Sequence, residues 1–182
     1  MVASVMIPER ELSQHSRGVT PGFTMLELIV TLAIAAILVS IAVPNFANFL
    51  SNNRASQDVQ LLGKSLSTAR GEAVARAANV FVSAEGGDWG KGWRIWVDLN
   101  DNGRWEDGET VRKVEAPESG ASISASQGGA AVNVFSYNSE GFLNGAGTVI
   151  FNYRAHPVEC SRDRDIRVGA SGQVNVSKAG CP

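Results

Sequence analysis

The sequence predicts an α+β fold in which one long N-terminal helix packs on an antiparallel β-domain of two small sheets. A continuous apolar run, FTMLELIVTLAIAAILVSIAV, occupies residues 23–43. Small and apolar residues then recur at spacings of three and four from Ala55 to Ala77, which is typical of one face of a helix. After Val80 the pattern changes to short alternating segments separated by glycine and asparagine clusters. A length of 182 residues suits one domain with an appendage.

The apolar run is long enough to cross a membrane. About 20 apolar residues span a bilayer core, and Glu27 is the only ionisable side chain in this run. Arg10 and Arg17 precede it, and positive charge favours the cytoplasmic side. We therefore expect a single-pass protein whose residues 44–182 lie outside the cytoplasm.

Glu27 is a candidate functional residue because a carboxylate at the centre of a membrane helix costs about 2.5–3.5 kcal/mol on insertion scales. It needs a cation, and the nearest one after removal of a leader would be the amino group of Phe23 in its own chain or in a neighbouring subunit. The alternative is that Glu27 lies near the bilayer interface and reaches water.

We expect the helix to continue beyond the apolar run. A helix over residues 23–78 would hold about 56 residues and be roughly 84 Å long. Pro44 should bend it or melt it locally, because proline removes a backbone donor and clashes with the preceding turn. The predicted parts are a hydrophobic helix half at 23–50, an amphipathic half at 51–79 and the β-domain at 80–182. Strands are expected at 80–84, 93–97, 110–114, 122–126, 132–137, 148–153, 166–168 and 173–176.

The start of the apolar run resembles a type IV prepilin. Gly22 is followed by Phe23, Glu27 is fifth from that junction, and Pro44 ends the apolar run. The resemblance implies that prepilin peptidase removes residues 1–22 as a leader on the cytoplasmic side of the inner membrane, that Phe23 is N-methylated, and that Glu27 acts in assembly. The remaining domain would then be periplasmic before assembly.

The β-domain resembles the GspH/FimT-like minor pilins. Residues 90–112, GKGWRIWVDLNDNGRWEDGETVR, carry a G-W strand, an Asn/Asp/Gly hairpin and a D-G-E turn, and the segments leading to Gly141 and Gly172 resemble the closing strands of that family. The resemblance implies a non-enzymatic subunit that helps initiate or cap a type IV pilus or a type II secretion pseudopilus. Its partners would be other minor pilins or pseudopilins and the major pilin.

Composition disfavours catalysis and general nucleic-acid binding. Two histidines and two cysteines leave little material for a zinc site or a Ser/His/Asp triad. Sixteen basic and 18 acidic side chains give a net charge of −2. We therefore expect neither an enzyme nor a bound cofactor, with one exception in the hairpin.

That exception is a calcium-loop pattern. Asp98, Asn100, Asn102 and Glu109 occupy positions 1, 3, 5 and 12 of D-x-[DN]-x-[DN]-G-x5-E, and the carbonyl of Arg104 stands at position 7. The flanking segments are predicted strands, whereas an EF-hand requires helices, and Asn/Asp/Gly runs also suit a tight hairpin. We predict a turn, with calcium binding as the alternative.

Cys160 and Cys181 are the only cysteines, and both lie in the exported part. An oxidising compartment favours a disulfide, which would stabilise the domain by about 3 kcal/mol. Two free thiols are the alternative.

A DNA-binding minor pilin acting in natural DNA uptake is the alternative function. Some FimT-like members bind DNA through a G-R-x-R motif, but the corresponding residues 172–175 are G-Q-V-N, without either arginine. The aspartates that alternate with the nearby arginines weaken the local positive field. The remaining candidates for phosphate contact are Arg162, Arg164 and Arg167.

Overall fold

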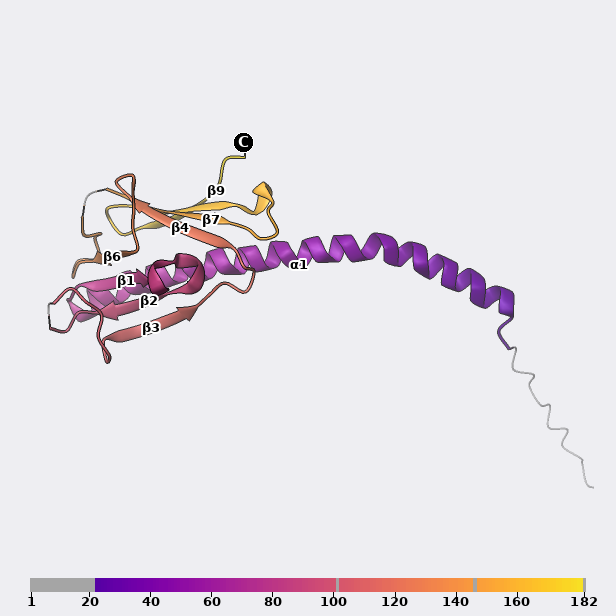
Figure 1. Ribbon diagram of the computed structural model, residues 1–182, viewed down its shortest axis with the longest axis horizontal. Helices are drawn as coiled ribbons and strands as arrows, with labels where there is room; N and C mark the ends of the chain where they lie inside the picture. The colour runs from indigo at the N-terminus through magenta and orange to yellow at the C-terminus, as the bar shows by residue number, and fades with distance from the viewer. Residues whose placement is uncertain (1–21, 101, 146, 182) are drawn as a thin grey trace, which may run out of the picture. The chain divides into compact units, whose positions relative to one another are not determined.

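The computed structural model describes residues 22–100, 102–145 and 147–181. In these residues one α-helix, α1 (Met25–Arg76), precedes nine strands (Figure 1). The chain divides into two compact units, Met1–Val43 and Pro44–Pro182. The predicted fold class, a long helix followed by two antiparallel sheets, is confirmed.

The described part of the first unit is the apolar beginning of α1. An 18-residue window of this helix has a mean hydropathy of 2.7, and none of the window is buried. By length and composition it is able to cross a membrane. Pro44 lies inside α1, which is helical on both sides of it, so local melting is not observed and a bend stays a prediction.

The second unit contains two antiparallel sheets (Figure 1). The four-stranded sheet has the order β3-β2-β1-β6, and the five-stranded sheet has the order β5-β4-β7-β8-β9. The first sheet comprises β1 (Val80–Ala84), β2 (Gly92–Val97), β3 (Thr110–Glu115) and β6 (Val134–Tyr137). The second comprises β4 (Ser122–Gln127), β5 (Ala130–Ala131), β7 (Val149–Arg154), β8 (Arg164–Val168) and β9 (Val174–Lys178).

All eight predicted strands are present, with bounds within two residues of those expected. β5 was not predicted, because two alanines after Gly128 and Gly129 carry no alternating pattern. Those glycines, both with positive φ, form the hairpin that returns β5 to β4.

The helix ends at Arg76, earlier than predicted. The amide of Ala77 donates to the carbonyl of Val74 (3.3 Å), and the amide of Ala78 donates to the carbonyl of Ala73 (3.2 Å). This is a Schellman cap, and it places Ala77 in the left-handed region with φ 52°. The prediction that Ala77 belongs to the buried face was therefore wrong, because the residue lies outside the helix and is exposed.

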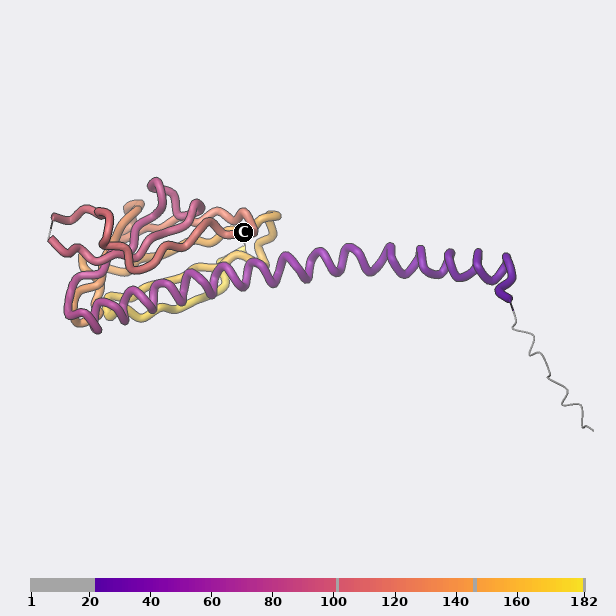
Figure 2. The backbone as a smooth tube through the Cα atoms, turned by 90° about the horizontal axis from the view of Figure 1, so that it is seen from below, coloured from indigo at the N-terminus to yellow at the C-terminus, as the bar shows by residue number. Residues whose placement is uncertain are grey.

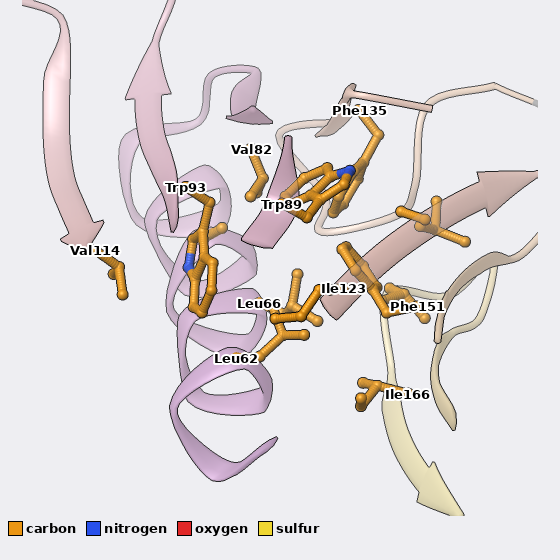
Figure 3. Close-up of a cluster of buried hydrophobic side chains, with 14 of the residues drawn as sticks. Leu62, Leu66, Val82, Trp89, Trp93, Val114, Ile123, Phe135, Phe151 and Ile166 are labelled. Carbon is orange, nitrogen blue, oxygen red and sulfur yellow. The ribbon is translucent and has the colours of Figure 1, made fainter. Parts of the chain in front are cut away.

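In the second unit, α1 runs alongside the strands (Figure 2), and the core lies between this helix and both sheets (Figure 3). Leu62 and Leu66 of α1 are fully buried, and they belong to one cluster with Trp93 of the first sheet and Phe151 of the second sheet. The predicted helix face is confirmed from Ala55 onward except at its last member. The remaining buried members of that face are Val59, Ala69 and Ala73.

Candidate functional site

The first residues of α1 form a capped helix start. Thr24 precedes the helix; its hydroxyl accepts a hydrogen bond from the amide of Glu27 (3.1 Å) and its carbonyl accepts one from the amide of Leu28 (3.1 Å). This is the T-x-x-E pattern of a capping box, a spacing that is visible in the sequence but was not among the predicted features. Glu27 therefore stands in the first helical turn, where the helix dipole favours a negative charge.

The predicted processing site lies at the edge of the described chain. Gly22 and Phe23 are exposed, and Phe23 retains 81% of its accessible surface. Most of the predicted leader, residues 1–21, lies outside the described residues. Cleavage after Gly22 and methylation of Phe23 stay predictions.

A buried carboxylate attaches the second half of the helix to the β-domain. Asp58 is 8% exposed, and its Oδ2 accepts hydrogen bonds from the hydroxyls of Ser119 and Tyr153, the latter at 2.9 Å. Ser119 lies between β3 and β4, and Tyr153 belongs to β7. Burial raises the pKa of Tyr153 above its usual range, so this phenol stays a donor at neutral pH.

A second polar contact joins the helix to the connection between β6 and β7, next to the turn before β9. The Nε of Arg70 donates to the carbonyl of Gly141 (3.0 Å), and Gly172 lies against both groups. A Cβ at Gly172 would lie 2.1 Å from that carbonyl oxygen, and its φ is 76°. Gly172 is therefore needed here for the close approach of two backbone segments.

A third contact involves Arg162, which is 6% exposed. Its Nε donates to Asn52 (2.7 Å), and its NH2 group donates to Asn48 (3.4 Å) and pairs with Glu159. Arg162 had been a candidate for phosphate contact. That prediction was wrong, because the guanidinium is buried and bound within its own chain.

The remaining candidate arginines do not form one surface. Arg164 donates to the carbonyls of Ser161 (2.8 Å) and Asp163 (2.7 Å), and its side chain lines a groove against α1. Arg167 is exposed, and alternation along β8 directs it to the opposite face of the sheet. The geometry therefore gives no specific support to DNA binding.

The disulfide is present as predicted. Cys160 and Cys181 are bridged with a Cα–Cα distance of 5.6 Å. Cys160 begins a 3₁₀ turn, Cys160–Arg162, which also contains the buried Arg162. The C-terminal segment is further held by a hydrogen bond from the amide of Ala179 to the carbonyl of Asp163 (3.2 Å).

The calcium-like segment is a hairpin loop between β2 and β3. The carboxylate of Asp98 accepts from the amides of Asn102 (3.1 Å) and Gly103 (2.6 Å). Glu109 is 5% exposed and accepts from the amides of Leu99 and Glu106, both at 2.9 Å. Strands on both sides confirm the predicted turn.

The side chains of Asn100 and Asn102 in this loop are also bound to the chain. Asn100 and Asn102 donate through their side-chain amides to Glu106, each at 2.9 Å. The Asn102 side-chain oxygen accepts from the amide of Arg104 (2.7 Å). These contacts explain how the loop holds its shape through hydrogen bonds to its own carboxylates.

Comparison with known proteins identifies the family. Residues 58–172 match the profile of the type II transport protein GspH, which is more than half of the chain. The chain belongs to the GspH family. Residues 21–43 of this GspH-family protein also match the prokaryotic N-terminal methylation motif. It is therefore a minor pilin or pseudopilin of the kind found in type IV pili or type II secretion.

Solved structures share this fold. The type IV minor pilin FimU of Pseudomonas aeruginosa is 19% identical with a TM-score of 0.58, and the match covers 71% of this chain and 92% of FimU. The minor pseudopilin EpsH from the type 2 secretion system of Vibrio cholerae is 12% identical with a TM-score of 0.52, covering 69% and 97%. No match was found among curated protein sequences.

Proposed function

We propose that this GspH-family protein is a non-enzymatic filament subunit that prepilin peptidase cleaves after Gly22 and that then helps initiate or cap a type IV pilus or type II secretion pseudopilus. The observation that carries the proposal is the apolar beginning of α1. It is unburied in the chain itself and starts at a Gly-Phe junction with a carboxylate in the first turn.

The physical argument begins with the exposed apolar surface. Leu26, Leu32 and Ile37 are each at least 60% exposed, and a protein does not leave such a surface in water. A membrane covers it before assembly, and apolar helices of other pilins cover it in a filament. The expected partners are therefore other minor pilins or pseudopilins, the major pilin, prepilin peptidase and the inner membrane.

Glu27 places a carboxylate at one end of this apolar surface. A carboxylate in apolar surroundings requires a positive partner, and cleavage after Gly22 would create an amino group at Phe23. In a filament the same pairing is available to the amino group of an adjoining subunit. The capped start of the helix, with Thr24 before it, would hold the carboxylate in the first turn.

Mass spectrometry of the mature protein tests processing. We expect Phe23 as the N-terminal residue, carrying one methyl group, and we expect Gly22→Leu to leave the leader attached. An unprocessed N-terminus in the wild-type protein from cells that assemble filaments contradicts the proposal.

Three variants separate pairing from helix capping. Glu27→Ala removes the charge, Glu27→Gln keeps the shape without the charge, and Thr24→Ala removes the cap while keeping the charge. Incorporation into filaments should fall for both Glu27 variants and change little for Thr24→Ala. Equal loss for Glu27→Gln and Thr24→Ala would assign Glu27 to helix initiation alone.

A further inference from the structure

A groove with basic side chains at its rim lies between α1 and the edge of the second sheet. Its volume is about 350 Å³, at the lower end of the range of about 300–1,000 Å³ for binding pockets. Ala55, Val59 and Val176 give it an apolar floor, and Lys64 and Arg164 stand at its rim. We call it the β9 groove.

The charges around the β9 groove are unbalanced. Among the described residues, three basic side chains line it and no carboxylate does. Arg162 is bound within the chain, but Lys64 and Arg164 form no ion pair with any described residue. Lys178 stands opposite Arg164 in the register of β8 and β9 and adds positive charge nearby.

The acidic side chains near this rim are paired with other arginines, and Glu159 pairs with Arg162 at 2.5 Å. Asp163 and Asp165 flank Arg164 in sequence, but both pair with Arg154, at 3.7 and 3.2 Å. Alternation along the strand directs these aspartates away from the face that Arg164 occupies. The groove therefore presents positive charge toward solvent.

The strand beside the groove has an open edge. β9 is the last strand of its sheet, so its second edge has no partner among the described strands. Val176, at the middle of β9, is 48% exposed and lines the groove. A free strand edge next to an apolar floor favours an extended polypeptide as the occupant.

We propose that the β9 groove binds an extended acidic segment of a neighbouring, different pilin subunit. An apolar side chain of that segment covers Val176 and the floor, and its carboxylates pair with Lys64 and Arg164. The proposal rests on the proposed function, because it requires a filament neighbour. A phosphate ligand, from DNA or lipid headgroups, would pair with the cations but leave the apolar floor uncovered.

A second copy of this chain is a poorer occupant. Its best acidic and apolar segment is the β2–β3 loop, where Leu99 is 72% exposed. Three carboxylates of that loop, those of Asp98, Glu106 and Glu109, already accept hydrogen bonds from the loop itself. Docking would have to break those bonds, whereas a different subunit can offer unengaged carboxylates.

The test is site-specific photocrosslinking of the full chain in cells that assemble filaments. A photoreactive residue replaces Gln60, which is exposed and lines the groove. In a second variant of the same protein, the photoreactive residue replaces Ile34 in the apolar beginning of α1 and reports contact with other pilin helices. Crosslinked peptides are identified by mass spectrometry.

We expect the Gln60 crosslink to fall on another pilin, within a segment that has Asp or Glu beside an apolar residue. Lys64→Glu and Arg164→Glu should each lower its yield about fivefold or more, since reversal turns attraction into repulsion. Arg167→Glu is the matched control, because it makes the same charge change on the opposite face of β8, and it should leave the yield unchanged. Reversing a carboxylate of the partner segment to lysine should restore the crosslink of Lys64→Glu.

Several outcomes overturn the proposal. One is a crosslink from position 60 to residues 98–109 of a second copy, to DNA or to lipid. Another is an unchanged crosslink yield in Lys64→Glu, and a third is a loss of yield in Arg167→Glu equal to that in Lys64→Glu. If the protein without a charge reversal crosslinks from position 34 but not from position 60, the groove proposal is rejected. If it crosslinks from neither position, the filament function itself is rejected.

Discussion

Removal of the Asp58 carboxylate should destabilise the Pro44–Pro182 unit. All buried apolar residues of the described chain lie between Ala55 and Ala179, so this unit contains the whole core and is suited to unfolding measurements. Asp58→Ala removes the acceptor of two hydroxyl groups, Ser119 and Tyr153, from a position that is 8% exposed.

The magnitude follows from the hydrogen bonds. Two bonds to a charged acceptor contribute about 1.5–3 kcal/mol each, hence about 3–6 kcal/mol together. The hydroxyls of Ser119 and Tyr153 are 3.3 Å apart and can then bond to each other, which recovers about 1 kcal/mol. Alanine also favours a helix over aspartate by up to about 0.7 kcal/mol. The expected loss of unfolding free energy is therefore about 1–4 kcal/mol.

Urea unfolding followed by tryptophan fluorescence measures this loss. Tyr153→Phe, which removes one donor, should cost about 1.5–3 kcal/mol, and the double variant should lose less than the sum, because the two groups share one bond. Gln57→Ala, an exposed neighbour on α1, is the control and should stay within about 0.5 kcal/mol of wild type. A change below about 0.5 kcal/mol for Asp58→Ala, or strict additivity with Tyr153→Phe, would refute the reasoning.

The same cluster predicts an alkaline dependence of stability. Burial raises the pKa of Tyr153 in the folded state, whereas an unfolded tyrosine ionises near pH 10. A raised folded pKa means that the stabilisation is fully present below about pH 10 and is lost as pH rises through and beyond that value. Tyr153→Phe should reduce the steepness of this alkaline loss. An unchanged pH dependence in that variant would contradict the assignment.

Three other predictions concern single sites. Ala77→Gly should stabilise the unit by about 0.5–1 kcal/mol, because φ at Ala77 is 52°. Ala78→Gly, at a position where φ is negative, should destabilise the unit, and thermal unfolding of both variants checks this difference in sign. Cys160→Ser or chemical reduction should cost about 3 kcal/mol, and an unchanged melting temperature would reject a stabilising disulfide. Glu109→Gln should lower the melting temperature in EDTA, because the carboxylate accepts hydrogen bonds from two backbone amides. Calcium should not raise the melting temperature of the wild-type protein, and a rise of several degrees with millimolar calcium would favour the metal alternative.

Local patterns were sufficient to predict the helix, the strands and the hairpin. Alternation over four to six residues and the glycine turns that follow reflect contacts between neighbouring parts of the chain. The predicted segment at 80–84 coincides with β1. The end of α1 at Arg76 was not predicted, because Ala77 occupies the left-handed cap position, where glycine is usual and would have marked the end.

The polar contacts between helix and sheets could not be predicted in the same way. Arg70 meets Gly141 across 71 residues, Asp58 meets Tyr153 across 95, and Arg162 meets Asn52 across 110. Helical spacing shows which side of α1 a residue occupies but not which loop will cover it. Arg162 was therefore interpreted as a surface cation, although its charge is buried against the helix.

These contacts have a role that the alanine-rich face cannot perform. Ala55, Ala69 and Ala73 allow the helix to approach the sheets closely, but small side chains of similar shape would pack almost as well after a shift of one helical turn. A shift of one turn would move Asp58 about 5.4 Å along the helix axis, out of reach of both hydroxyls. The apolar face therefore supplies most of the contact area, and the polar contacts select a single register between α1 and the strands.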